Sequence, residues 1–178
     1  MKSVRIVVMA ALLSAALFGS GCGSVTVRHV PKLGVISSAK MSNLRSSQPI
    51  DIKSGMSNSE ETSIGTVGMG KVVGKLSEWT EATVGAVKTN LVARGATITA
   101  GSPKALTVTM TRAEVKAIPI VGGAKSKIVL TATTPDGLNS TFEGSGSSLA
   151  PLSAVDGAVA DAVKKLLMDG AVDAYLRK

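Results

Sequence analysis

The feature that most constrains the fold of this chain is the order in which two hydrophobic periods occur after residue 76. A helical period comes first, in Trp79, Val84, Val87 and Leu91. Strict alternation follows in residues 106–111, where a strand would bury Leu106, Val108 and Met110. The helical period then returns in Val155, Val159, Val163, Leu166 and Leu167. This order of helix, strands and helix predicts helices packed on a sheet.

The first helix has signals at both ends. Ser77 is a natural N-cap, and Arg94 followed by Gly95 is typical of a helix C-terminus. Trp79 can be interpreted as a ligand-stacking residue, but on the packed face of a helix it is more often part of the core. We therefore expect a helix from Ser77 to Arg94 that buries Trp79.

The last helix is predicted to begin at Ser153, because Asp156 follows three residues later as in a capping box. It should continue to about Leu176 and be weakened at Gly170, since glycine costs about 1 kcal/mol relative to alanine in a helix interior. Asp161 can pair with Lys165 four residues later. The aspartates of this helix are interpreted as its wet face: Asp156, Asp161, Asp169 and Asp173.

Strand-like composition marks several shorter segments, bounded by glycine, proline and serine. They are residues 32–37, 49–53, 96–100, 106–111, 127–134 and 138–144, the last two joined by a turn at 135–137. Residues 42–47 and 56–62 are predicted loops, and the apolar loop 118–123 is a candidate partner site. The predicted fold class is α+β, a single two-layer domain with a mainly antiparallel sheet and two helices packed on one face.

The N-terminus is typical of an export signal. Two cations precede an apolar run of thirteen residues, 6–18, and small residues follow before Cys22. The run is too short to span a hydrocarbon core of about 30 Å. We therefore expect residues 1–21 to be removed, residues 22–31 to form a tether, and residues 32–178 to form one periplasmic domain.

Cys22 is the only cysteine of the chain, and the residues before it resemble a bacterial lipobox. The resemblance implies cleavage before Cys22 and acylation of that residue, although Gly19 stands where leucine is usual. The alternative is a secreted protein with a free thiol, which in an oxidising compartment would be reactive. Gly23, in place of aspartate, implies by the same resemblance delivery to the outer membrane.

The charge balance is basic but dispersed. The chain has a net charge of +8, and removing Lys2 and Arg5 with the signal leaves +6. The cations are scattered, and after the signal the aromatic residues are Trp79, Phe142 and Tyr175, too few for base stacking. The sequence therefore predicts a solvated basic surface and no nucleic-acid partner.

Residues 65–72 read GTVGMGKV, close to the phosphate-binding pattern G-x-x-x-x-G-K-[ST]. Val72 stands where a hydroxyl would hold Mg²⁺, and an exported chain meets no ATP. We therefore predict no nucleotide partner. The expected structure is a hairpin with arms at 64–67 and 71–73, and Lys71 is expected to be ordinary surface charge.

The residue inventory argues against catalysis. His29 is the only histidine and lies in the predicted tether, so no rigid base is available to activate a serine. Clusters for a transition metal and calcium loops are also missing from the sequence. We predict no enzyme activity, no cofactor and no metal.

Taken in order, several patterned segments resemble the YajG-type bacterial lipoproteins. They are residues 64–67 with the glycines that follow, Glu78-Trp79 leading a helix that ends at 91–95, the strand 106–108, the turn Asp136-Gly137, and residues 158–163 with Leu167 and Asp169. The resemblance implies an α/β domain tethered to an envelope membrane and no established enzymatic activity.

Two functions follow as hypotheses. The first is a lipid-anchored outer-membrane lipoprotein that faces the periplasm and engages another envelope protein as a structural component. The second is a ligand-binding accessory module of an envelope transport system, for an anionic lipid or glycan. It predicts a concave pocket with converging cations such as Arg112, Lys125 or Lys127.

Overall fold

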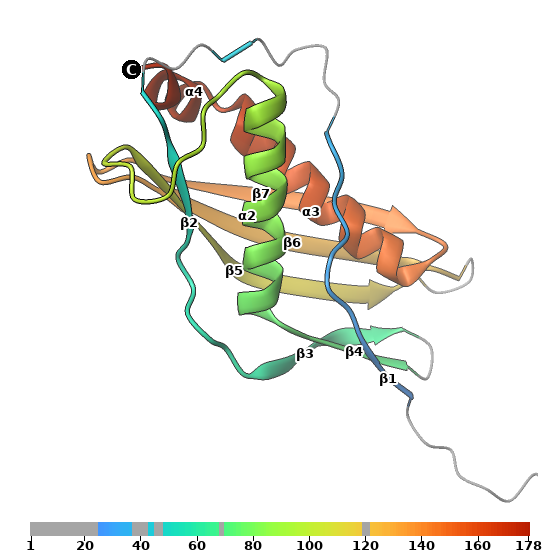
Figure 1. Ribbon diagram of the computed structural model, residues 1–178. Helices are drawn as coiled ribbons and strands as arrows, with labels where there is room; N and C mark the ends of the chain where they lie inside the picture. The colour runs from blue at the N-terminus through green and yellow to red at the C-terminus, as the bar shows by residue number, and fades with distance from the viewer. Residues whose placement is uncertain (1–24, 37–42, 45–47, 68–69, 119–121) are drawn as a thin grey trace, which may run out of the picture.

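The computed structural model describes residues 25–36, 43–44, 48–67, 70–118 and 122–178, and in them a seven-stranded sheet carries helices on one face (Figure 1). The described elements are β1 (Val25–Arg28), β2 (Asp51–Ser54), β3 (Glu61–Val67), β4 (Gly70–Lys75), α2 (Leu76–Ala93), β5 (Ala105–Ala117), β6 (Ala124–Thr133), β7 (Asn139–Ser148), α3 (Pro151–Met168) and α4 (Gly170–Arg177).

The strand order is β1-β4-β3-β5-β6-β7, and β2 lies beside the first half of β5. The longest ladders, β5–β6 and β6–β7, are antiparallel. The pairs β1–β4, β2–β5 and β3–β5 are parallel, so the sheet is mixed. The predicted α+β class with one two-layer domain is confirmed. Within the described residues, α4 is a third helix that the sequence did not predict as a separate element.

The two long helices lie on the same face of the sheet (Figure 1). α2 packs over β5 and β2, and α3 packs over β6 and β7. Their inward side chains meet those of the strands in one core, which includes the fully buried Trp79, Leu106 and Val159. The hydrophobic stripes of both helices, as read from the sequence, are buried.

α2 begins one residue before the predicted N-cap. β4 runs directly into the helix at Leu76, so Ser77 lies inside the first turn and the cap position falls on Lys75. The Ser59 hydroxyl accepts from the backbone N–H of Ser77 at 2.9 Å and so replaces the missing cap. The predicted end at Arg94 is confirmed.

The predicted start of the last helix at Ser153 is wrong, because α3 begins at Pro151, whose fixed φ suits the first helical turn. The predicted continuity to Leu176 is also wrong. α3 ends at Met168, and the Asp169 carboxylate accepts from the N–H groups of Ala171 and Val172 at the start of α4. The weak point predicted at Gly170 is therefore a break between two helices.

α3 approaches β7 at backbone distance. A Cβ added at Gly144 would meet the backbone oxygen of Ala158, and one added at Gly146 would meet that of Ala154. The helix contributes the fully buried alanines Ala154, Ala158 and Ala162 to this contact. Two glycines facing small residues thus let α3 lie almost on the edge strand.

Residues 29–36 form what we call the strap, an extended segment that runs between α2 and α3 (Figure 1). His29 is 8% exposed, and its carbonyl accepts from the Trp79 indole at 2.7 Å. Its Nε2 lies 2.8 Å from Asp156 Oδ1 on α3. Farther along, the N–H of Ile36 donates to Asn90 Oδ1 on α2 at 2.7 Å.

The tether predicted over residues 22–31 therefore needs correction. Val25–Arg28 pair with β4, and His29 and Pro31 are buried. Hydrophobic periodicity did not predict that these residues belong to the domain, because helix side chains and a single strand partner hold their backbone. The domain begins by Val25.

Among the other strand predictions, 49–53, 106–111, 127–134 and 138–144 match β2, β5, β6 and β7 with shifted ends. The strand predicted at 32–37 is wrong where it is described, since residues 32–36 belong to the irregular strap. The strand predicted at 96–100 reduces to one bridge between Ile98 and Ile50. The loop predicted at 56–62 ends earlier, because β3 begins at Glu61.

The glycine contact between α3 and β7 gives a stability prediction. Gly146→Val should lower the free energy of unfolding by about 3 kcal/mol, because the added side chain must displace the α3 backbone. Urea unfolding followed by circular dichroism measures this. Ser147→Val, on the exposed side of the same strand, is the matched control and should change stability by less than about 0.5 kcal/mol. Equal effects of the two substitutions would contradict the close packing.

Candidate functional site

The face of the sheet opposite the helices carries the polar side chains that could contact a partner. A bulge between Met110 and Arg112 shifts the register of β5 against β6. Before the bulge, Thr107 and Thr109 lie on the helix-free face. After the bulge, the side chains of Arg112, Glu114 and Lys116 lie on this face. The bulge thus divides the face into a threonine half and a charged half.

The N–H of Met110 at this bulge is satisfied by the helix layer. β2 pairs with β5 up to Val108 and β3 pairs only from Val115. In between, the Met110 N–H donates to Thr80 Oγ1 of α2 at 3.1 Å. A threonine on the buried side of α2 therefore replaces a strand partner, which sequence periodicity could not reveal.

Strand register places three lysines in one row across the helix-free face. Each residue of the row pairs with the next one on the neighbouring strand. From β1 to β7 the row consists of Thr26, Lys71, Thr66, Lys116, Lys125 and Ser147. All six residues are exposed. We call Lys71, Lys116 and Lys125 the lysine row. These lysines lie 45 and 9 positions apart in sequence, so only the register brings them together.

One step inward from the row, acidic and basic side chains form ion pairs. Arg112 contacts Glu114, and Lys127 Nζ lies 2.8 Å from Glu143 Oε1. Hydrogen bonding to Arg112 lowers the pKa of Glu114, and hydrogen bonding to Lys127 lowers the pKa of Glu143. The same bond raises the pKa of Lys127. Lys116 of the lysine row joins this network, since its Nζ lies 3.8 Å from the second oxygen of Glu114. The row is therefore the cationic margin of a set of ion pairs.

A shallow hollow of about 300 Å³ lies beside the row, where β5 and β6 approach their connecting loop. Its lining consists of Glu114, Lys116, Ala117, Ile118, Lys125 and Lys127. A second hollow, of about 260 Å³, shares Lys125 and Lys127 and extends to β7. Of the cations predicted to converge on a pocket, Lys125 and Lys127 line both hollows. Arg112 lies outside them and contacts Glu114.

The threonine half carries the cross-strand neighbours Thr107 with Thr133 and Thr109 with Thr131. Thr107, Thr109 and Thr131 are half-buried. β-branched side chains suit a pleated surface without any binding role. The ladder is the polar cover of this half of the sheet.

The structure places the residues singled out in the sequence in different parts of the domain. Cys22 lies outside the described residues. Trp79 is fully buried, which confirms its place in the core. Residues 64–67 and 71–73 belong to the arms of the β3–β4 hairpin as predicted, and positions 68–69 lie outside the described part. Gly65 is a required glycine, since a Cβ there would meet the Val115 carbonyl.

The interpretation of the C-terminal aspartates as a wet face needs correction, because each has a structural partner. Asp156 binds the strap, and Asp169 caps α4. Asp161 forms the predicted pair with Lys165 at 2.9 Å and also accepts from the N–H of Ser145. Asp173 binds both the buried Arg94 and Arg177, and the hydrogen bond with Arg177 is the main cause of its lowered pKa.

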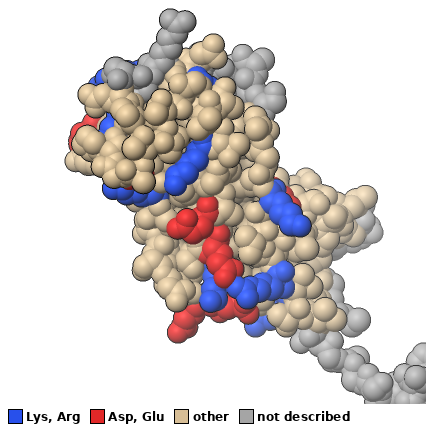
Figure 2. Space-filling view, viewed as in Figure 1, with Lys and Arg blue, Asp and Glu red and all other residues tan. Residues whose placement is uncertain are grey.

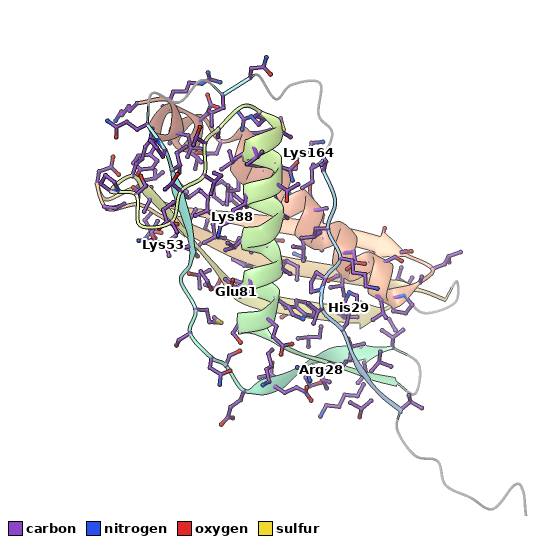
Figure 3. The ribbon with its side chains drawn as sticks, in the orientation of Figure 1. Arg28, His29, Lys53, Glu81, Lys88 and Lys164 are labelled. Carbon is purple, nitrogen blue, oxygen red and sulfur yellow. The ribbon has the colours of Figure 1, made fainter. Side chains whose placement is uncertain are left out.

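His29 is close to a carboxylate, but its surroundings are those of a packed residue. Figure 3 shows it on the strap between α2 and α3. Its ring stands edge-on to Trp79, with the centroids 6.2 Å apart. Among the described residues, no group of three or more His, Cys, Asp and Glu side chains is placed to hold a metal ion.

Among the described helices, none is long and apolar enough to cross a membrane. On the helix side, acidic and basic side chains lie together in the lower part of the view, and uncharged areas separate them from the cations above (Figure 2). Comparison with known families and with curated proteins found no match.

The candidate site consists of the helix-free face near the lysine row, because the row, the ion pairs and both hollows lie there.

The ion pairs of the charged half give a titration prediction. Lys127→Gln should raise the pKa of Glu143 toward its ordinary value, because the main cause of its lowering is removed. Glu114 should keep a lowered pKa, since Arg112 is its main partner. Carboxyl ¹³C NMR titration measures both groups, and Lys164→Gln on α3 is the control that should move neither. An unchanged Glu143 in the Lys127 variant would contradict the pairing.

Proposed function

We propose that this chain is a lipid-anchored lipoprotein of the bacterial outer membrane, facing the periplasm, with a structural or interaction role and no catalysis. The observation that carries the proposal is the layout of the N-terminus. A cationic start and a thirteen-residue apolar run lead through small residues to Cys22, the only cysteine. Several acyl chains would make the attachment effectively permanent.

The arrangement of the domain supports the same role. Two residues separate Cys22 from β1. β1 and the strap are bound to the rest of the domain through β4, Trp79 and Asp156. A pull on the anchor would thus be transmitted to the core of the domain. Similarity of the sequence segments to the YajG-type lipoproteins points to the same class of protein.

A second candidate function is an accessory module that binds an anionic lipid or glycan. It is favoured by the hollow of about 300 Å³, in which Ile118 and Ala117 supply apolar surface beside Lys116 and Lys125. In that case Ile118→Ser should abolish lipid that co-purifies with the detergent-extracted protein, measured by mass spectrometry. Equal amounts of lipid in parent and variant would remove this candidate.

The anchor is tested by substituting its cysteine. Cys22→Ala should move the protein from the membrane fraction to the soluble periplasmic fraction, because no residue would accept acyl chains. Ser24→Ala is the matched control and should remain in the membrane fraction. Mass spectrometry of the parent should show an acylated N-terminal peptide beginning at Cys22. Identical fractionation of Cys22→Ala and parent, with no acylated peptide, would refute the proposal.

A further inference from the structure

Six strands of the sheet meet at one of its ends. The register places Val25 of β1 beside Gly70 of β4, which in turn pairs with Val67 of β3. At the same end, Ala117 of β5 pairs with Ala124 of β6, and Ala124 pairs with Ser148 of β7. The β6–β7 turn and α4 lie at the opposite end (Figure 1). We call the first of these the hairpin end.

The chain enters the domain at the hairpin end. Two residues, Gly23 and Ser24, separate Cys22 from the first residue of β1. A fully extended chain covers at most about 3.6 Å per residue, so Cys22 lies within about 11 Å of Val25. An acyl anchor on Cys22 would therefore hold this end of the domain close to the lipid headgroups.

The surface chemistry of this end suits such a position. The lysine row crosses the sheet here, and its six register positions include no acidic residue. Glu114, one step inward from the row, is bound by Arg112, and its second oxygen lies 3.8 Å from Lys116 Nζ, so Lys116 is shared between this carboxylate and the surface. Two large apolar side chains are exposed at the same end, Val25 at 62% and Leu149 at 79%. Lysines beside exposed apolar side chains are typical of surfaces that bind anionic bilayers.

We propose that the hairpin end is a membrane-docking surface, in which Lys71, Lys116 and Lys125 bind anionic phospholipid headgroups while Val25 and Leu149 enter the interface. This rests on the proposed function for its location in the envelope. The surface itself uses only described residues and acts without the anchor. It would fix the orientation of the domain, with its threonine half and the β6–β7 turn directed away from the bilayer.

The test uses the chain from residue 23 onward, so that no acyl group contributes. The strands, the helices and the core described above all lie within residues 25–178, so this chain keeps the whole domain. Co-sedimentation should show stronger binding to vesicles of phosphatidylglycerol and phosphatidylcholine, mixed one to three, than to phosphatidylcholine alone. Binding should weaken as salt is raised.

The variants separate this surface from general basicity. Lys71→Gln, Lys116→Gln and Lys125→Gln combined should lower the affinity for the mixed vesicles about a hundredfold, since each lysine at an anionic surface contributes about fivefold. The matched control combines Lys32→Gln, Lys88→Gln and Lys164→Gln, which remove the same charge from the helix side, and should retain most of the binding. Figure 3 shows Lys88 on α2 and Lys164 on α3. Leu149→Ser should also weaken binding.

Three results would overturn the proposal: equal loss in the two triple variants, no preference for the anionic vesicles, or self-association of the parent that the lysine-row variant abolishes without any vesicle binding. The last would identify the surface as a contact between copies. None of these results depends on acylation, so failure here is distinct from failure of the Cys22 anchor, which the fractionation experiment measures.

Discussion

The hydrogen bond from the Trp79 indole to the carbonyl of His29 is the interaction on which the arrangement of this domain depends. It joins the helix layer to the strap at a fully buried position. Because a buried donor without a partner would cost about 1–3 kcal/mol, the indole is a strong reason for the strap to stay in place. Asp156 holds the other side of the same residue. Through the strap, the position of β1 is also set.

From β1, the same constraint extends to the sheet. Val25–Arg28 pair with β4 and lead into the strap, and β4 in turn leads directly into α2. The helix that binds the strap is thus also the helix that the β3–β4 hairpin positions. On the helix-free face, the β5 bulge brings Lys116 into register with Lys71 and Lys125 through Thr66. The entry point of the chain and the lysine row therefore share one end of the domain.

Much of the fold could be predicted because its long elements follow a single period. The stripe from Val155 to Leu167 and the alternation of Leu106, Val108 and Met110 both describe buried faces correctly. The predictions that were wrong concern segments whose structure depends on contacts between residues far apart in the sequence. The strap has no period, because Asn90 and Asp156 hold its backbone. The prediction of Ser77 as N-cap was wrong because β4 joins α2 without a loop. The Ser59 hydroxyl instead accepts from the Ser77 N–H.

The candidate site was predictable in part for the same reason. Lys125 and Lys127 were predicted among the cations that converge on a pocket, and they line both hollows. Lys71 was interpreted as ordinary surface charge, since nothing near it in sequence suggested a neighbour. Its place in a row with Lys116 depends on a parallel contact of two residue pairs between β3 and β5. A pairing of only two residues produces no hydrophobic pattern in the sequence from which it could be predicted.

The most direct test of the whole account is the orientation of the acylated protein on a bilayer. With Cys22 acylated, a single new cysteine can carry a fluorophore, either as Leu149→Cys at the hairpin end or as Asp136→Cys at the β6–β7 turn. Quenching by spin-labelled lipid headgroups measures the proximity of each label to the membrane. The account predicts strong quenching at position 149 and little at position 136. Equal quenching at both positions, or stronger quenching at 136, would contradict it.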